Sequence, residues 1–181
     1  MRRRSRGRIG VILTGELIIN TNPHAARPRA GETILGGGIA AALLDIALAM
    51  TFWWFYSGAS PWAILQSIAA GLLGKESFAG GMGTAALGAF LHVFIACVMA
   101  AVYYLGCLRW PVLYKKPVFC GAVYGVILYL AMSYIVLPLS KASPMPFIPS
   151  WFLASVLSHV VFVGIPIALV ARWSAARSAS S

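Results

Sequence analysis

The sequence predicts an all-α, polytopic membrane protein with four transmembrane helices, and two observations carry this prediction. Hydrophobic residues make up 60% of the 181-residue chain and charged residues only 10%, which is more apolar surface than a soluble domain of this length can bury. The chain also contains four apolar runs that are each long enough to cross the roughly 30 Å hydrocarbon core of a bilayer. These runs cover residues 34–56, 82–105, 117–139 and 148–171.

The first 33 residues differ in composition from everything that follows. They begin with the basic run MRRRSRGR, continue with a short apolar run that contains Glu16, and end in a polar, proline-containing stretch. A basic start before a short apolar run resembles a secretory signal, but Glu16 interrupts the apolar run and no small-residue cleavage pattern follows. We therefore expect residues 1–33 to form a basic, poorly ordered cytoplasmic arm.

The first apolar run, ILGGGIAAALLDIALAMTFWWFY, carries a single charge, at Asp45. A carboxylate near the centre of a membrane helix costs about 2.5 to 3.5 kcal/mol on insertion scales, so Asp45 is expected to face other protein and not lipid. Residues 61–74 follow this run and contain too many glycine and proline breaks to span. Their apolar residues recur at helical spacing, which predicts a short interfacial or re-entrant helix anchored by Trp62.

The remaining three runs each carry a feature of interest. The second holds His92 without any formal charge, the third holds the GxxxG pair Gly121 and Gly125, and the fourth holds His159. Residues 34–173 are therefore expected to form one four-helix transmembrane domain, followed by a disordered cytoplasmic tail at 174–181.

The positions of the fourteen Lys and Arg residues predict the orientation. Seven lie in the N-terminal arm, three in the loop after the second run and two after the fourth run, which leaves only Lys75 and Lys141 in the other two loops. Because basic loops stay in the cytoplasm, both termini are expected there. Basic residues in such positions act as topology signals, so we expect no nucleic-acid partner.

Four polar residues fall at nearly the same depth when residues are counted from the helix ends at about 1.5 Å each. They are Asp45, His92, Tyr129 and His159. One interpretation is a shared polar cluster at the membrane midplane. The alternative is that each histidine only bonds a neighbouring backbone or serine group in the core.

Small residues predict which helix faces meet. Asp45 shares its side with small residues of the first run, and His92 lies on the same side as Gly88. In the third run, Tyr129 continues the face of Gly121 and Gly125. Since small residues let helices approach closely, Gly88, Gly121 and Gly125 are the predicted helix-packing positions.

Three segments resemble a group of small bacterial four-helix inner-membrane proteins that is uncharacterised. They are LQSIAAGLLGKESFAGGMGTAALGAFLHVFIA, AVYGVILYLAMSYIVLPLS and HVVFVGIPIALVAR. The resemblance covers roughly residues 34–172 and is strongest between 64 and 92. It implies the four-helix fold and a location in the bacterial inner membrane, and it brings no activity.

The sequence contains no motif typical of an enzyme. It has no P-loop, no HExxH and no G-x-S-x-G elbow. Ser150, Ser155 and Ser158 precede His159, as in an intramembrane hydrolase, but one acid on a distant helix makes a poor triad. Helix packing is the more ordinary role for these serines, and no enzymatic activity is expected.

Three function classes remain open. The preferred one is a non-enzymatic helper or accessory protein whose polar cluster fixes helix register, with the lipid bilayer and a second copy or another membrane-complex subunit as partners. The second is a transporter or proton-conducting protein in which Asp45, His92 and His159 change protonation. The third is a protein in which His92 and His159 ligate haem b or another metal, although no cofactor is expected.

Overall fold

The computed structural model describes residues 27–180, and every regular element in this range is helical. Four helical segments are long and apolar enough to cross a membrane: Glu32–Ser57, Gly81–Arg109, Pro117–Leu139 and Pro149–Ser180. The predicted all-α polytopic class with four spans is therefore confirmed. The basic run at the start of the chain lies outside the described residues.

The first two spans and the short helix between them account for the first half of the fold. Their elements are η1 (Glu32–Gly36), α1 (Gly37–Ser57), α2 (Pro61–Leu73), η2 (Gly74–Ala79) and α3 (Gly81–Arg109). The second half starts with a short connecting helix and holds the other two spans. Its elements are α4 (Val112–Lys115), α5 (Pro117–Ala131), η3 (Met132–Val136), α6 (Leu137–Leu139), α7 (Pro149–Ser158), η4 (His159–Gly164) and α8 (Ile165–Ser180).

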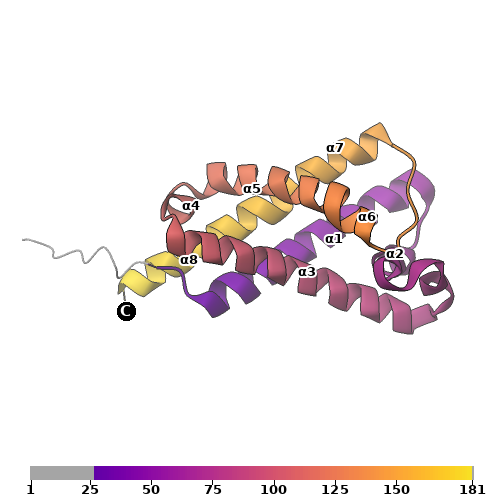
Figure 1. Cartoon of the computed structure of the whole chain (residues 1–181), viewed down its shortest axis with the longest axis horizontal. Helices are drawn as coiled ribbons and strands as arrows, with labels where there is room; N and C mark the ends of the chain where they lie inside the picture. The colour runs from indigo at the N-terminus through magenta and orange to yellow at the C-terminus, as the bar shows by residue number, and fades with distance from the viewer. Residues whose placement is uncertain (1–26, 181) are drawn as a thin grey trace, which may run out of the picture.

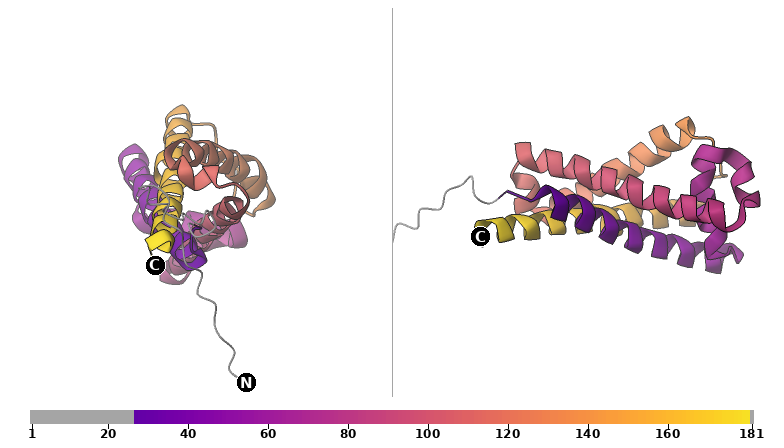
Figure 2. Two further views of the ribbon diagram at one scale, coloured as in Figure 1. Left: turned by 90° about the vertical axis from the view of Figure 1, so that its left-hand side faces the viewer. Right: turned by 90° about the horizontal axis from the view of Figure 1, so that it is seen from below.

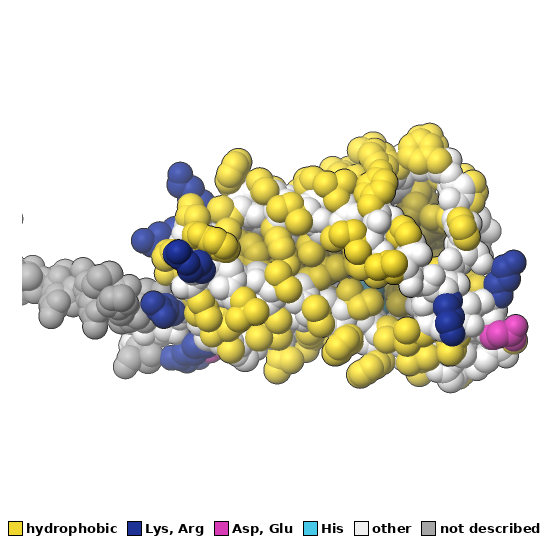
Figure 3. Space-filling view, in the orientation of Figure 1, with side chains coloured by type: hydrophobic (Ala, Val, Ile, Leu, Met, Phe, Trp, Pro, Cys, Tyr) yellow, Lys and Arg dark blue, Asp and Glu magenta, His cyan; other side chains and the backbone are white. Residues whose placement is uncertain are grey.

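The four spans run lengthwise beside one another, and α2 lies across one end of the bundle (Figures 1 and 2). Helix α1 packs against α3 on one side and against η4 and α8 on the other, while α5 packs against η4 and α8. The outside is largely hydrophobic, as expected for a surface that faces lipid (Figure 3). Most Lys and Arg side chains in this view gather at the end that holds α4 and the C-terminus. We call this the basic end and the opposite one the α2 end.

The ends of α1 and α2 follow from local chemistry. Gly58 ends α1 in the left-handed conformation, at φ 69°, where glycine has no steric penalty. Ser60 then caps α2 by accepting a hydrogen bond from the Ala63 backbone N–H at 3.2 Å. Pro61 takes the first helical position, where a missing N–H costs nothing. These residues turn the chain from the first span into the short helix at residues 61–74 that the sequence predicts.

Two spans contain a stretch of wider π-helix ahead of a proline. The η4 segment (His159–Gly164) precedes Pro166, and η3 (Met132–Val136) precedes Pro138. Proline has no N–H to give to the carbonyl four residues earlier, so the regular hydrogen-bond ladder is broken just before it. A π-turn accommodates such a break and rotates the residues on either side of it relative to a regular helix. In the fourth span this rotation begins at His159.

The three glycines predicted to pack between helices lie where backbones approach too closely for any side chain. A Cβ on Gly125 would overlap the backbone of His159 and Val160, and one on Gly121 would lie 2.7 Å from the Gly164 carbonyl oxygen. Both contacts join α5 to η4. Gly88 instead faces the Leu65 backbone of α2, so its partner is the short helix and not another span.

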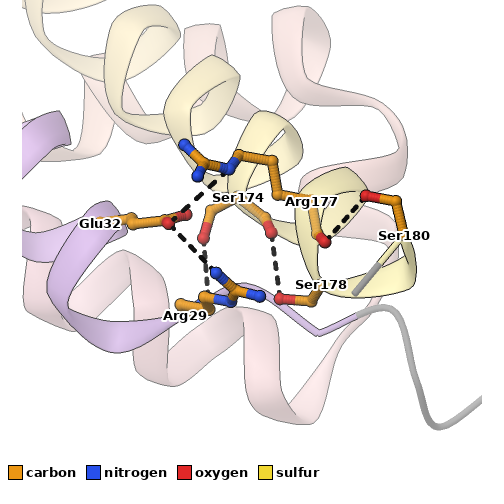
Figure 4. Close-up of polar contacts among 6 residues, drawn as sticks. All are labelled: Arg29, Glu32, Ser174, Arg177, Ser178 and Ser180. Atoms are coloured by element: carbon orange, nitrogen blue, oxygen red, sulfur yellow. Dashed lines mark hydrogen bonds and ion pairs between the residues drawn. The ribbon is translucent and has the colours of Figure 1, made fainter.

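Residues 174–180 differ from the expectation of a disordered tail, because α8 continues to Ser180. The Ser174 hydroxyl is buried and accepts a hydrogen bond from the Arg29 backbone N–H at 2.8 Å. Glu32 lies 3.5 Å from the Arg29 guanidinium and 4.0 Å from that of Arg177 (Figure 4). These contacts tie the start of the first span to the end of the fourth and explain why both helices are longer than predicted.

The same contacts correct the boundary of the N-terminal arm. The described part of the expected arm, residues 27–33, is attached to the bundle, and the first helical segment already begins at Glu32. Thr33 is fully buried. The second span is also longer than expected and ends at Arg109.

The contacts of Gly125 generate a stability prediction. Gly125→Leu should lower the free energy of unfolding by about 1–3 kcal/mol or more, because the new side chain must displace backbone atoms of η4. Gly106→Leu is the matched control, since a Cβ there would meet only the mobile end of the Leu113 side chain. Thermal unfolding in mild detergent measures both. Equal losses of stability would contradict the close contact between α5 and η4.

Candidate functional site

A cavity of about 180 Å³ lies between α1, α2, α3, α7 and η4. Three of the four residues predicted to form a polar cluster line it, namely Asp45, His92 and His159. By the ~1.5 Å rise per residue, each lies roughly 15 to 18 Å from the end of its span at the α2 end. That is about half the thickness of a bilayer core. The other lining residues are Ile46, Leu48, Ala49, Trp53, Ile64, Ser67, Ile68, Trp151, Ser155 and Ser158.

Asp45 is held by a partner on the fourth span. The buried Ser158 hydroxyl donates a hydrogen bond to Asp45 Oδ1 at 2.5 Å. The other carboxylate oxygen, Oδ2, lies 3.9 Å from His92 Nε2, close enough for an ion pair when the imidazole is protonated. Asp45 thus has one hydrogen-bond partner on the fourth span and an imidazole within ion-pair distance on α3.

The contacts of His92 fix where its proton sits. Its Nε2 lies 3.0 Å from the carbonyl oxygen of Ala42. A carbonyl oxygen can only accept, so Nε2 carries a hydrogen and donates it. In the neutral ring the free lone pair is then on Nδ1, and protonation there gives an imidazolium whose Nε2–H faces both Ala42 and Asp45. His92 therefore links α3 to α1 in either protonation state.

His159 is positioned by its own helix and by α5. Its Nδ1 lies 2.8 Å from the Ser155 carbonyl oxygen and must donate to it, which leaves Nε2 as the free nitrogen of the neutral ring. The imidazole packs edge-on against Tyr129, with ring centroids 5.7 Å apart and an interplanar angle of 81°. Tyr129 also packs against Phe152. The structure places Tyr129 behind His159 and outside the cavity lining.

Two contributions to the site did not follow from the sequence. Ser158 appeared there only as a helix-packing serine, although it adjoins His159 and so lies at the same depth. Helix α2 was not expected to reach the polar residues, yet Ile64, Ser67 and Ile68 form part of the wall. The helical spacing of the isoleucines was visible in the sequence, but the direction they face was not.

The cavity has the size and polarity to hold water. Liquid water occupies about 30 Å³ per molecule, so several molecules fit beside the carboxylate and the imidazoles. The side chains of His92 and Asp45 keep 18% and 22% of their surface accessible. None of the described residues that line the cavity is Lys or Arg, so the charge of Asp45 is balanced only when a histidine is protonated. The site therefore combines one carboxylate with two imidazoles.

Ligation of haem b or another metal by His92 and His159 stays a prediction. The cavity is smaller than the ~300–1,000 Å³ of typical ligand pockets. His92 donates from Nε2 and His159 from Nδ1 to backbone carbonyls, which leaves Nδ1 of His92 and Nε2 of His159 as the free ring nitrogens. Among residues 27–180 no group of three or more His, Cys, Asp or Glu side chains is arranged to hold a metal ion.

Comparisons of the chain with protein-family models, curated proteins and solved structures found no match. Its class is therefore defined by fold and site alone. It is an all-α polytopic membrane protein with a polar cavity between its spans.

A double-mutant cycle tests the bond between Asp45 and Ser158. Asp45→Ala and Ser158→Ala should couple by about 1–3 kcal/mol in the free energy of unfolding, because either change alone removes the hydrogen bond and leaves its partner, buried Ser158 or partly buried Asp45, without it. Ser155→Ala is the matched control, since Ser155 lines the same cavity on the same helix. Its effect should add to that of Asp45→Ala within about 0.5 kcal/mol. Both cycles are measured by unfolding in mild detergent. Additive effects in both would contradict the hydrogen bond between Asp45 and Ser158.

Proposed function

We propose that this chain is a small bacterial inner-membrane protein that conducts protons through the cavity at Asp45, His92 and His159, with both termini in the cytoplasm. The observation that carries the proposal is the convergence of a carboxylate and two imidazoles on one water-sized cavity among the membrane spans. Ionisable groups at this depth are costly and typically belong to proton or ion pathways. The charge distribution supports the orientation, because twelve of the fourteen basic residues lie on the side of the termini.

Protonation of this cluster would change contacts between three spans. With Asp45 ionised, its carboxylate accepts from Ser158 and attracts a protonated His92. Neutralising Asp45 removes that attraction and adds a donor to the carboxyl group, so the Ser158 hydroxyl no longer needs to point at it. Protonation in the cavity would therefore change contacts of α1, α3 and the fourth span together.

The two sides of the cavity differ, which supports access from the α2 end. Toward the basic end the spans are in tight contact: a Cβ on Gly38 would lie 2.7 Å from Cys97 Cα, and the buried core cluster includes Ala41 and Ala100. Toward the α2 end, Trp53 and Trp151 line the cavity with ring centroids 5.1 Å apart. In the proposed orientation protons enter from the periplasm past these two indoles.

A second candidate is the accessory or helper role, in which the cluster only fixes how the helices pack. It is favoured by one observation: the contacts of Asp45 and His92 join α1 to the fourth span and to α3, while His159 bonds within its own span. A cluster that only fixes helix packing requires no proton movement.

Proton flux into liposomes separates the two candidates. Purified protein reconstituted with a pH-sensitive dye inside the vesicles should carry protons when a potassium diffusion potential is applied. Asp45→Asn should reduce the flux to that of empty liposomes, because it removes the only acid in the cavity. Glu76→Gln is the control, since Glu76 is an acid exposed outside the spans. Wild-type flux equal to that of empty liposomes would overturn the proposal and leave the helper role.

A further inference from the structure

A second, larger cavity of about 320 Å³ lies at the basic end, between α3, α4 and α5. It belongs to a part of the fold that the proton pathway does not use. Its wall is made by hydrocarbon and ring surfaces, among them Val102, Trp110, Leu113, Val123 and Ile127. This volume is within the range of pockets that hold a small ligand.

Two tyrosines keep the groove open and apolar. The rings of Tyr103 on α3 and Tyr124 on α5 contact each other with centroids 5.0 Å apart, so they separate the two helices. Their hydroxyls point away into backbone contacts: Tyr103 donates to the Leu113 carbonyl at 2.9 Å and Tyr124 to the Met99 carbonyl at 2.7 Å. With these polar atoms already paired, the surface left to the groove is suited to a hydrocarbon chain.

The groove is open on the side that faces lipid. Val123 and Ile127 are 47% and 54% exposed on α5, and Val102 faces them from α3 with similar exposure. In a bilayer, such surface is in contact with acyl chains. An acyl chain that enters the groove contacts side chains on two helices and therefore gains more dispersion contacts than it has on a flat helix face.

The mouth of the groove is strongly basic. The Arg109 guanidinium lies 6.0 Å from the ring centroid of Trp110, which itself lines the groove. Lys115 and Lys116 follow in the same turn between α3 and α5, and the sequence contains no acid after Glu76. The described acid at the basic end, Glu32, is already in ion pairs with other residues, and the positive charge at this mouth lies beside a tryptophan of the kind found at head-group level.

We propose that this groove binds an anionic phospholipid, with an acyl chain against Val123 and Ile127 and the phosphate near Arg109, Lys115 and Lys116. Charge complementarity selects an anionic head group over a zwitterionic one, because basic clusters beside membrane spans attract anionic lipids. The proposal does not depend on proton conduction, since no residue of the polar cavity takes part in it.

Lipid binding to the purified full-length protein tests the head-group half of the proposal. Native mass spectrometry in mild detergent can compare phosphatidylglycerol with phosphatidylcholine of identical acyl chains, and phosphatidylglycerol should bind more tightly. Arg109→Gln should weaken phosphatidylglycerol binding about fivefold, which corresponds to one basic group near a membrane surface. Lys75→Gln, at the opposite end of the bundle, should leave it unchanged. Equal binding of the two lipids to the wild-type protein would overturn the anionic preference.

Filling the groove tests the acyl-chain half. Val123→Phe should occupy the groove and lower the binding of phosphatidylglycerol about fivefold, with Ile127→Phe as an independent second variant. Val126→Phe is the matched control, because Val126 lies on the same helix with 42% exposure and does not line the groove. Thermal unfolding of each variant verifies the fold. Equal losses with Val126→Phe, or no loss with either groove variant, would show that the groove does not hold the chain.

Discussion

The structure depends on one constraint, which is that the carboxylate of Asp45 must be satisfied inside an apolar bundle. Asp45 is the only aspartate in the chain and lies near the middle of the first span. Leaving it against lipid would cost about 2.5–3.5 kcal/mol. Ser158 on the fourth span donates a hydrogen bond to it and His92 on the second span lies within ion-pair distance, so one side chain links three helices.

Small residues let the spans approach closely enough to make these contacts. Gly38 lets α1 approach α3, and Gly121 and Gly125 let α5 approach the π-turn that begins at His159. The contacts of Gly38 and Gly121 lie on the basic-end side of the cavity, and that of Gly125 lies at the depth of His159. The same bundle thus combines a closed half, in which backbones touch, with a half that has room for water beside ionisable groups.

Much of the fold could be predicted from hydropathy, because spanning a bilayer requires a long apolar run and little else. The predicted third span, 117–139, has the bounds found in the structure. The longer ends of the first and fourth spans could not be predicted, since they depend on Glu32 meeting Arg177 and on Arg29 meeting Ser174, pairs that are far apart in sequence.

For the site, counting residues along the helices brought Asp45, His92 and His159 to one depth. It could not select Ser158 over Ser155 as the partner of Asp45, because that choice depends on how the spans are rotated. The same ambiguity placed Tyr129 in the cluster, whereas its ring lies behind His159.

The distance between Asp45 and His92 is the quantity on which the shared site depends. Solid-state NMR in lipid bilayers can measure the dipolar coupling between a ¹³C-labelled aspartate carboxyl and ¹⁵N-labelled histidine rings. Because the chain has a single aspartate, the carbon signal reports on Asp45 alone. We predict a short-range coupling, consistent with the 3.9 Å between His92 Nε2 and Asp45 Oδ2, that is lost in His92→Gln and kept when His24 is replaced. Absence of the coupling in the wild-type protein would contradict the shared polar site, and its persistence in His92→Gln would contradict the contact between Asp45 and His92.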